Sequence, residues 1–414
     1  MGIAERIKRS NIGSRSTEET PAVILQLIPR LALGGLERDA VDIAGAAARA
    51  GATSLIATEG GPLLNDVFRS GAKPVELPFE DGFFGRARYT RRLAKLLRRY
   101  RVDIVHAHDP ATARAALAVA ERTGALVVTT CGSAYPGVPG PGRRQTEILL
   151  QGDRVIVLSE FTSSFVRVQR PEVVERLRLV ERGVDFTRFD PERVPAERVV
   201  RLLQQWRLPD GAPIVMHIGR FAPEKGQETM LDAVARLNRK DIACVMVGYD
   251  AGHEGYREAV EERAEALGFG ARAHVTDDCR DLPAAYMLAD VVVVAPAVPG
   301  ASGRVVREAQ AMGRPVVAID HGGWRRLVEG GQMTWLVPPG DPAALTQAIA
   351  QALALTATTR ARLAPLAAAN MALSGSKEAM LLATLAVYGE LLQASEPVHA
   401  ARAAPASDAA LTTT

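Results

Sequence analysis

The segment VVVVAPAVPGASGRVVREAQAMG, residues 291–313, decides the fold, because it joins a strand to a helix through a loop of glycine and proline. Consecutive valines are typical of a strand buried in a parallel sheet, and the residues from 303 onward have helical periodicity. The backbone amides of 302–305 lie at the expected helix start, where the helix dipole favours an anion. One turn later, Glu308 offers two acceptor oxygens suited to vicinal hydroxyls such as those of a ribose.

The alternation of strand and helix continues in both directions from this segment. The expected strands are 22–28, 53–57, 74–77, 102–107, 125–130, 154–158, 213–219, 242–247, 291–295 and 315–319. The expected helices are 36–51, 88–100, 110–123, 159–168, 226–238, 255–267, 303–312, 341–353 and 376–393. Strands that alternate with helices form parallel sheets covered on both faces. We therefore predict an α/β protein with two doubly wound, Rossmann-like domains that face each other across a cleft, where the carboxyl ends of the strands bind ligands.

The length of 414 residues is more than one hydrophobic core usually covers, which agrees with two domains. We place the first domain at 21–190 and the second at 200–375, with a linker rich in Pro, Asp and Arg around 185–212. The ends of the chain, 1–20 and 395–414, are expected to be disordered, because the last segment is rich in Ala, Pro and Thr and cannot bury much.

Composition and motifs argue against several classes of protein. The net charge of +3 does not indicate a nucleic-acid partner. Cys131, Cys244 and Cys279 lack CxxC spacing, so we expect no disulfide framework or zinc site, and a reducing cytoplasm fits. The first twenty residues have no apolar core, and no run approaches the length that spans a bilayer.

Cofactor and catalytic fingerprints are also missing from the sequence. There is no GxGxxG after the first strand, no phosphate-binding P-loop and no nucleophile elbow, which disfavours a nicotinamide-dependent dehydrogenase or an ATPase. The stretch VHAHDP brings His106, His108 and Asp109 together, but such a pair of histidines is more often structural than metal-binding. We therefore expect neither a metal nor a cofactor.

Two loops that follow strands are candidates for holding phosphate. Gly34 and Gly35 open a helix in PRLALGGLERD, where glycine lets backbone amides approach an anion, although a Gly pair before a helix is more often plain turn chemistry. In GRFAPEKGQE, Arg220 and Lys225 lie at the expected cleft edge and suit a diphosphate. The alternative is a solvated loop in which these cations pair with Glu224.

Eight motifs follow one another along the chain: GGLERDAVDIAGAAARAGA, DIVHAHDP, RVIVLSEF, ERGVDFTRFDP, GRFAPEKGQETMLDAVARL, DLPAAYMLADVVVVAP, GRVVREAQAMGRPVVAIDHGG and WLVPPGDPAAL. Taken together, these motifs resemble those of the family 4 glycosyltransferases, which are retaining, metal-independent enzymes of the GT-B fold. The resemblance covers roughly residues 21–394.

The resemblance implies roles for particular residues. Arg220 and Lys225 would bind the donor diphosphate and act as the catalytic cations. The donor-binding residues implied are Gly34, Gly35, Gly303, Arg304, Val305 and Glu308. The first domain would be the acceptor side and the second the nucleotide-sugar side, with the last helix, 376–394, crossing back to the first domain.

The implied function is a retaining, hexosyl-type glycosyltransferase. It would move a sugar from a nucleoside-diphosphate sugar to a glycan or lipid-linked acceptor in cell-envelope polysaccharide or lipopolysaccharide synthesis.

This sequence departs from the family pattern at several positions near the transferred sugar. The first Glu of the E-x7-E motif is replaced by Gly300, the following aromatic residue by Ser302, and the usual His by Cys131 or Gly132. An expected acid is Arg326, and an expected Gly is Thr334. These losses favour, as an alternative, a catalytically degenerate relative that binds nucleotide sugar or acts as a partner subunit.

A basic segment suggests contact with a membrane surface. Residues 85–101 contain eight Arg and Lys and no acid, and Leu93, Leu96, Leu97 and Tyr100 share one side of the expected helix. Such a helix docks on anionic lipid, here at the inner face of the cytoplasmic membrane, or else it is a solvated cationic face above a packed stripe.

Overall fold

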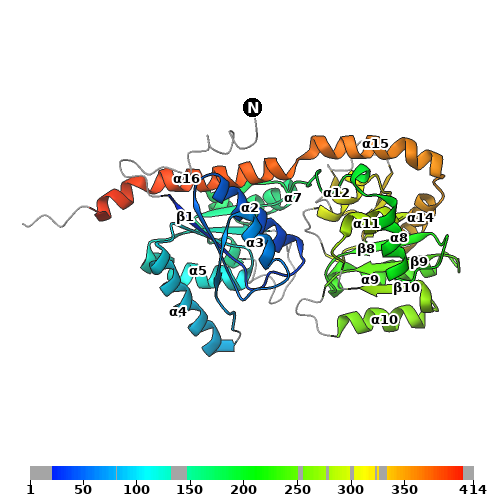
Figure 1. The fold of residues 1–414 in the computed structure, drawn as a ribbon, viewed down its shortest axis with the longest axis horizontal. Helices are drawn as coiled ribbons and strands as arrows, with labels where there is room; N and C mark the ends of the chain where they lie inside the picture. Colours follow the sequence, from blue (N-terminus) through cyan, green and yellow to red (C-terminus); the bar gives the residue numbers. More distant parts are fainter. Residues whose placement is uncertain are drawn as a thin grey trace, which may run out of the picture.

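The computed structural model describes residues 21–80, 82–131, 147–249, 255–276, 279–298, 303–321, 324–325 and 333–403. Two lobes stand side by side, and a pair of C-terminal helices runs along both of them (Figure 1).

The first lobe is built on a sheet of seven parallel strands. Their order across the sheet is β3 (Lys73–Glu76), β2 (Thr53–Thr58), β1 (Val23–Leu27), β4 (Ile104–Ala107), β5 (Leu126–Cys131), β6 (Arg154–Val157) and β7 (Leu177–Leu179). Its helices are α2 (Gly35–Arg49), α3 (Leu64–Ser70), α4 (Gly82–Tyr100), α5 (Pro110–Thr123) and α7 (Glu160–Gln169). The order reverses beside β1, which pairs with both β2 and β4, so a ligand-binding crevice is expected at the carboxyl end of β1.

The second lobe repeats this arrangement with six parallel strands. Their order is β10 (Ala273–Thr276), β9 (Ala243–Val247), β8 (Ile214–Ile218), β11 (Val291–Val294), β12 (Val316–Ile319) and β13 (Thr334–Val337). Its helices are α8 (Ala196–Gln205), α9 (Gln227–Ala235), α10 (Tyr256–Ala266), α11 (Leu282–Leu288), α12 (Arg304–Ala311), α14 (Pro342–Leu353) and α15 (Ala357–Ser374). The predicted α/β class with two Rossmann-like sheets is confirmed.

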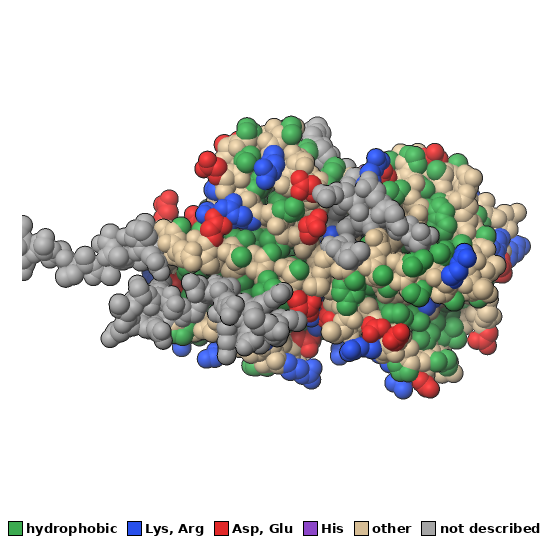
Figure 2. All heavy atoms as spheres, turned by 90° about the horizontal axis from the view of Figure 1, so that it is seen from above, with side chains coloured by type: hydrophobic (Ala, Val, Ile, Leu, Met, Phe, Trp, Pro, Cys, Tyr) green, Lys and Arg blue, Asp and Glu red, His purple; other side chains and the backbone are tan. Residues whose placement is uncertain are grey.

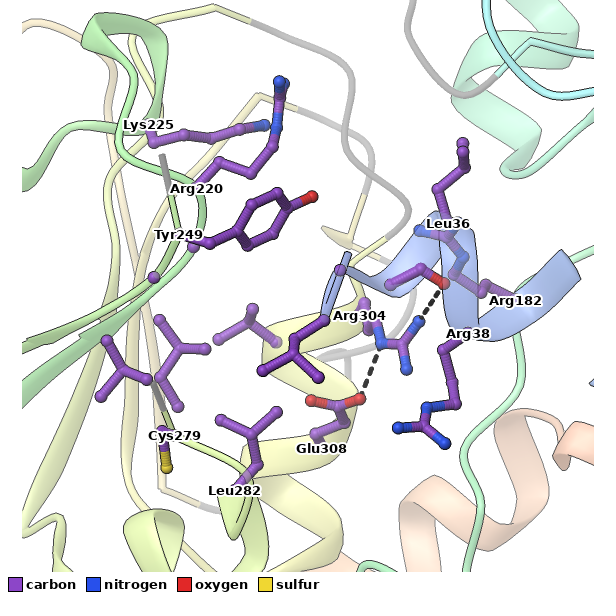
Figure 3. Close-up of a pocket in the computed structure, with 18 of the residues that line it drawn as sticks. Leu36, Arg38, Arg182, Arg220, Lys225, Tyr249, Cys279, Leu282, Arg304 and Glu308 are labelled. Atoms are coloured by element: carbon purple, nitrogen blue, oxygen red, sulfur yellow. Dashed lines mark hydrogen bonds and ion pairs between the residues drawn. The ribbon is translucent and has the colours of Figure 1, made fainter. Parts of the chain in front are cut away.

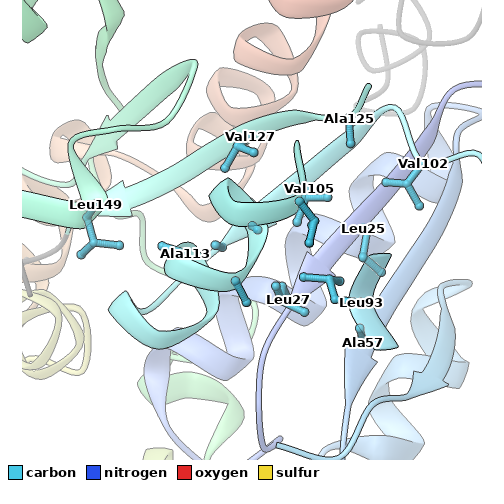
Figure 4. Packing of buried hydrophobic residues seen from close by; sticks show 14 of the residues in the cluster. Leu25, Leu27, Ala57, Leu93, Val102, Val105, Ala113, Ala125, Val127 and Leu149 are labelled. Atoms are coloured by element: carbon cyan, nitrogen blue, oxygen red, sulfur yellow. The ribbon is translucent and has the colours of Figure 1, made fainter. Parts of the chain in front are cut away.

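Apolar side chains cover both faces of the first sheet. Leu25, Leu27 and Val105 point to one face and pack beneath α4 and α5 (Figure 4). Ile24 and Ile104, their neighbours along the strands, point to the other face, which α2 and a long last helix, α16 (Lys377–Ala403), cover. Because side chains alternate along a strand, strands buried on both faces read as continuous apolar runs, which is the pattern seen in the sequence.

The segment between the lobes belongs structurally to the second one. Phe189, Trp206 and their apolar neighbours are buried in the core of the second lobe, so the chain joins that lobe near Val184 rather than at the expected residue 200. Val184 also forms a β-bridge with Ser376, where the chain returns toward the first lobe. The two crossings between the lobes therefore lie side by side.

The last helix extends further than expected. α16 continues to Ala403, so residues 395–403 are helical rather than part of a structureless tail, and 404–414 lie outside the described residues, as do 1–20. Alanine has the highest helix propensity, which agrees with a helical end in a segment rich in alanine. Helix α15 was not expected at all, because its internal Pro365 argues against a helix.

The stretch VHAHDP is structural. Both ring nitrogens of His106 are hydrogen-bonded, Nδ1 with the Tyr388 hydroxyl at 2.6 Å and Nε2 with the Thr130 hydroxyl at 2.7 Å. Asp109 caps α5 by accepting from the amides of Ala111 and Thr112. Within the described residues, no group of three or more His, Cys, Asp or Glu side chains is arranged to hold a metal ion.

The basic helix α4 does not present its leucines to lipid. Leu93, Leu96 and Leu97 are buried against the sheet, so docking through that apolar side, as the sequence suggested, is wrong. Two other apolar side chains are exposed at its start, Phe83 at 84% and Phe84 at 79%. No helix in the described part of the chain has the length and apolar character needed to cross a membrane.

Candidate active site

A cavity of about 640 Å³ lies between the two lobes at the carboxyl ends of their strands. This volume is in the range of sites that bind cofactors and other ligands of similar size. All eight residues singled out from the sequence line it: Gly34, Gly35, Arg220, Lys225, Gly303, Arg304, Val305 and Glu308. Gly35 and Arg304, which are 269 positions apart in the chain, are thus brought to one site.

Arg220 and Lys225 lie together on the second-lobe side of the cleft. They follow β8, and Figure 3 shows their charged ends next to each other. Arg220 Nη2 contacts Glu224 Oε1 at 3.3 Å, whereas Lys225 forms no ion pair with a carboxylate of the described residues. Burial, and then the neighbouring Arg220, lower the pKa of Lys225. A cation whose charge is disfavoured by its surroundings gains more from a bound anion.

The loop that carries Lys225 is held closely against the second sheet. Gly226 has a φ of +82°, and a Cβ there would lie 1.8 Å from the Ala295 carbonyl oxygen, so only glycine fits. The buried His217 contacts the Lys225 carbonyl oxygen through Nε2 at 2.9 Å. Backbone contacts of this kind fix the position from which the ammonium group reaches the cleft.

Glu308 projects from α12 and is 4% exposed. Its Oε2 accepts from the Tyr286 hydroxyl at 2.9 Å and its Oε1 from Arg304 Nε at 2.8 Å. Burial, and then Glu308, raise the pKa of Tyr286, which therefore remains a donor. Each carboxylate oxygen has a second lone pair, so Glu308 can still accept from a ligand hydroxyl.

The glycine pair allows the two lobes to approach closely. A Cβ on Gly34 would lie 2.2 Å from the Tyr249 hydroxyl oxygen, and one on Gly35 would lie 2.5 Å from Arg304 Nη1. Tyr249 and Arg304 belong to the second lobe. In the structure, these glycines therefore make room for side chains of the other lobe. That they also make room for phosphate stays a prediction from the sequence.

Gly303 shapes the start of α12. It is the N-cap residue and has a φ of +63°, a left-handed conformation that glycine adopts without strain. The amides of Arg304 and Val305 follow at the helix start, where unpaired N–H groups favour an anion. Gly300 and Ser302, the residues that replace the family's Glu and aromatic residue, lie outside the described part of the chain.

The other departures from the family pattern are placed as follows. Cys131 ends β5 and is fully buried, so its thiol does not take the place of an imidazole in the cleft. Thr334 begins β13 and is hydrogen-bonded to Gln310 Nε2. Gly132 and Arg326 lie outside the described residues.

Several cleft residues were not identified from the sequence. Arg182 and Arg188 belong to ERGVDFTRFDP, which was assigned only to the region before the linker, and Tyr249 follows β9. Arg188 packs its guanidinium over the Phe189 ring at 5.2 Å, and burial and the nearby Arg38 lower its pKa. The location of Tyr249 just after a parallel strand was the signal that could have found it.

Comparisons with known proteins agree with this architecture. The family model described as glycosyl transferases group 1 matches residues 201–368, and that described as glycosyltransferase family 4 matches residues 33–188. A D-inositol 3-phosphate glycosyltransferase of Xylanimonas cellulosilytica is 30% identical over 305 residues, which cover 70% of this chain and 72% of the relative.

Solved structures share the two-lobed fold. A glycosyltransferase from Rickettsia africae superposes with a TM-score of 0.74 at 25% identity, over 90% of this chain and 99% of that one. Anabaena HepE, solved with UDP and glucose, gives 0.73 at 20% identity, over 92% and 100%. Two Rossmann-like lobes around one cleft define the GT-B class of glycosyltransferases. Within that class, the chain belongs to glycosyltransferase family 4.

Proposed function

We propose that this glycosyltransferase takes its sugar from a nucleoside-diphosphate donor bound mainly by the second lobe. The observation that carries the proposal is the pair Arg220 and Lys225, two cations held side by side at the end of β8. When the bond from the sugar to the diphosphate breaks, the departing group gains negative charge, and fixed cations nearby stabilise it. Glu308 would orient the ribose, and the amides of Arg304 and Val305 would contact the donor.

A diphosphate donor is also supported by a protein of the same fold, since Anabaena HepE was solved with UDP and glucose. We propose a hexosyl donor and a retaining reaction, as is usual for the family. The first lobe would then hold the acceptor, with closure of the cleft excluding water.

The acceptor we propose is a glycan or a lipid-linked sugar used in cell-envelope polysaccharide or lipopolysaccharide synthesis. Arg38 and Arg69 of the first lobe, together with Arg188, line the cleft. Cations in these positions favour an acceptor that carries phosphate, as lipid-linked diphosphates do. The Xylanimonas relative is named for an acceptor of that chemistry, D-inositol 3-phosphate.

Peripheral contact with an anionic membrane in the cytoplasm is part of the proposal. It rests on the exposed cations of α4 together with Phe83 and Phe84 at its start. Aromatic side chains insert at the boundary between lipid headgroups and acyl chains, and cations add electrostatic attraction. The buried leucines of α4 take no part in this form of the hypothesis.

The direct test has two stages. UDP, GDP, ADP and dTDP are first screened by thermal shift, and we expect one of them to raise the melting temperature in a concentration-dependent way. Sugar nucleotides of the selected base are then assayed for release of the nucleoside diphosphate. If no nucleotide stabilises the chain, the proposed donor class is wrong.

A second candidate function is a catalytically degenerate relative that binds nucleotide sugar or serves as a partner subunit. The replacement of the family's usual His by Cys131 or Gly132 favours it, and the Cys131 side chain is buried. A general acid or base contributes about 10²–10⁴-fold to the rate. Loss of such a group would therefore impair turnover and leave nucleotide binding intact. Calorimetric binding of a sugar nucleotide without transfer to any acceptor would support this candidate, and measurable transfer would contradict it.

A further inference from the structure

The side chain of Arg304 connects residues of both lobes. Nε donates to Glu308 Oε1 at 2.8 Å within the second lobe. Nη1 donates to the Gly35 carbonyl oxygen at 2.7 Å and to Asp39 Oδ1 at 3.1 Å, both on α2 of the first lobe. Figure 3 shows the guanidinium between Glu308 and the first turn of α2. Arg304 therefore contacts both Glu308, the carboxylate proposed to hold the ribose, and the wall of the cleft that the first lobe forms.

The partner carboxylate on the first lobe is itself held in place. Asp39 Oδ2 accepts from Arg182 Nε at 2.5 Å, and the Asp39 side chain is 13% exposed. The Arg304 side chain is 24% exposed. Ion pairs shielded to this degree are screened much less by salt than pairs on the surface. Glu308 and Asp39 raise the pKa of Arg304 despite its burial, so it stays charged at any physiological pH.

The glycine loop is matched to this arginine. A Cβ on Gly35 would lie 2.5 Å from Nη1, 3.0 Å from Cδ and 3.1 Å from Cζ of Arg304. The φ of Gly35 is not left-handed, so the backbone itself would accept alanine. The absence of a side chain at position 35 is therefore needed for the close approach of the guanidinium.

We propose that Arg304 is a positioning residue that orients Glu308 and fastens α2 to the second lobe, so that nucleotide binding and closure of the cleft are coupled. The nucleotide part of this inference rests on the proposed function; the fastening of the lobes does not. A nucleotide that contacts Glu308 would bind the closed arrangement better, and its apparent affinity would fall with the fraction of closed molecules.

The first experiment measures closure without any ligand. We expect Arg304→Leu and the isosteric Asp39→Asn each to increase the radius of gyration of the full chain in small-angle X-ray scattering. Arg263→Leu is the matched control, because its ion pair with Asp232, at 2.6 Å, lies within the second lobe and away from the cleft. Unchanged scattering in both cleft variants, with native circular dichroism, would overturn the fastening role.

The second experiment measures affinity for UDP, with GDP as the alternative probe, by calorimetry. Arg304→Leu and Asp39→Asn are expected to weaken binding of whichever nucleotide the unmodified chain takes up, by about 5- to 150-fold. Their double variant is expected to be weaker than Arg304→Leu only by what the loss of the Asp39–Arg182 pair adds, because both substitutions remove the Asp39–Arg304 ion pair. Full additivity, or unchanged affinity, would contradict the coupling.

Gly35→Ala gives a test that alters no charge. We expect it to weaken nucleotide binding in the unmodified chain and to have little further effect in Arg304→Leu, where the space is vacated. An equal effect in both backgrounds would mean that Gly35 acts without Arg304. An unmodified chain that binds neither UDP nor GDP would count against the proposed donor, while the scattering experiment would still decide whether Arg304 fastens the lobes.

Discussion

Charge of one sign dominates the cleft at the scale of single residues. The cations that line it are Arg38, Arg69, Arg182, Arg188, Arg220, Lys225, Arg280 and Arg304. The carboxylates among the described lining residues are Asp66 and Glu308. Low-dielectric walls strengthen this field, so the cleft attracts anions and strengthens their binding.

Lys225 and Glu308 are expected to differ in what their removal does. Lys225→Ala should lower kcat by about 10²–10³-fold, because a fixed charge beside the departing diphosphate acts mainly in the transition state. Glu308→Ala should mainly raise KM, since the ribose is held equally in the ground state and the transition state. Steady-state kinetics with the selected donor measure both. Equal, small effects of the two substitutions would speak against the roles assigned to them.

The pKa of Lys225 predicts how donor binding depends on pH. Burial lowers this pKa below the ordinary 10.5, so the free protein loses the charge on Lys225 earlier as pH rises. Donor affinity should therefore decline on the alkaline side at a pH below the ordinary lysine value. Calorimetry across the pH range checks this, with Lys225→Arg as the control, because arginine keeps its charge throughout. If the donor affinity of Lys225→Arg fell with the same midpoint, a group other than Lys225 would be responsible for the pH dependence.

Helix α4 shows, at the scale of elements, how packing changes the meaning of a pattern. Its apolar stripe, including Tyr89 and Leu93, faces the core, so its cations lie on the outside of the molecule. On the sheet face opposite α4, α16 runs along the lobe, and acidic and basic side chains are interspersed on the side of the molecule seen in Figure 2. The cation-rich surface of the first lobe is therefore on its α4 side, and not on the side covered by α16.

The membrane hypothesis for α4 leads to a flotation experiment. Vesicles with anionic lipid should carry the protein upward, whereas neutral vesicles should not, because attraction of about 1 kcal/mol per cation requires a negative surface. Replacing Phe83 and Phe84 together by serine should weaken flotation. Phe68→Ser is the matched control, since this side chain on α3 is also exposed, at 61%. Equal recovery with both kinds of vesicle would remove the hypothesis.

At the scale of the whole molecule, the last helix, α16, packs on the sheet of the first lobe. Tyr388 of α16 is fully buried against the first sheet and accepts from Gln26 Nε2 on β1 at 3.0 Å. Its hydroxyl also lies 2.6 Å from His106 Nδ1 on β4. The helix that leaves the second lobe is thereby bonded to the central strands of the first.

Removing one hydroxyl should measure the contribution of this link. Tyr388→Phe should reduce the free energy of unfolding by about 1–3 kcal/mol, because Gln26 and His106 each lose a buried partner. Tyr256→Phe is the control, as its hydroxyl is 3.5 Å from Glu228 and half-buried. Denaturant unfolding monitored by circular dichroism gives both values. Equal losses would show that the buried network adds nothing specific.

Most of the fold could be predicted from local patterns in the sequence. The valines of 291–294 and the apolar runs before Gly34 and Arg220 predicted buried strands followed by ligand-binding loops, because periodicity and turn chemistry depend on neighbours in the chain. The strands β7 and β13 were not expected. β7 has only three residues, which is too little pattern to recognise, and only the last residue of β13 is buried, so it lacks the continuous apolar run of the central strands. α15 was missed for a different reason, the proline inside it.

The sequence by itself determined two doubly wound lobes, the cleft between them and eight of the residues that line it, from strand, loop and helix signals read locally and from the resemblance to family 4. Only the tertiary structure decided that Arg304 meets Asp39, that Tyr388 meets His106 and that the leucines of α4 are buried. The first two pairs are 265 and 282 residues apart in the chain. Such contacts depend on how whole layers pack, because free energy from burial and charge depends on three-dimensional neighbours that no local pattern encodes.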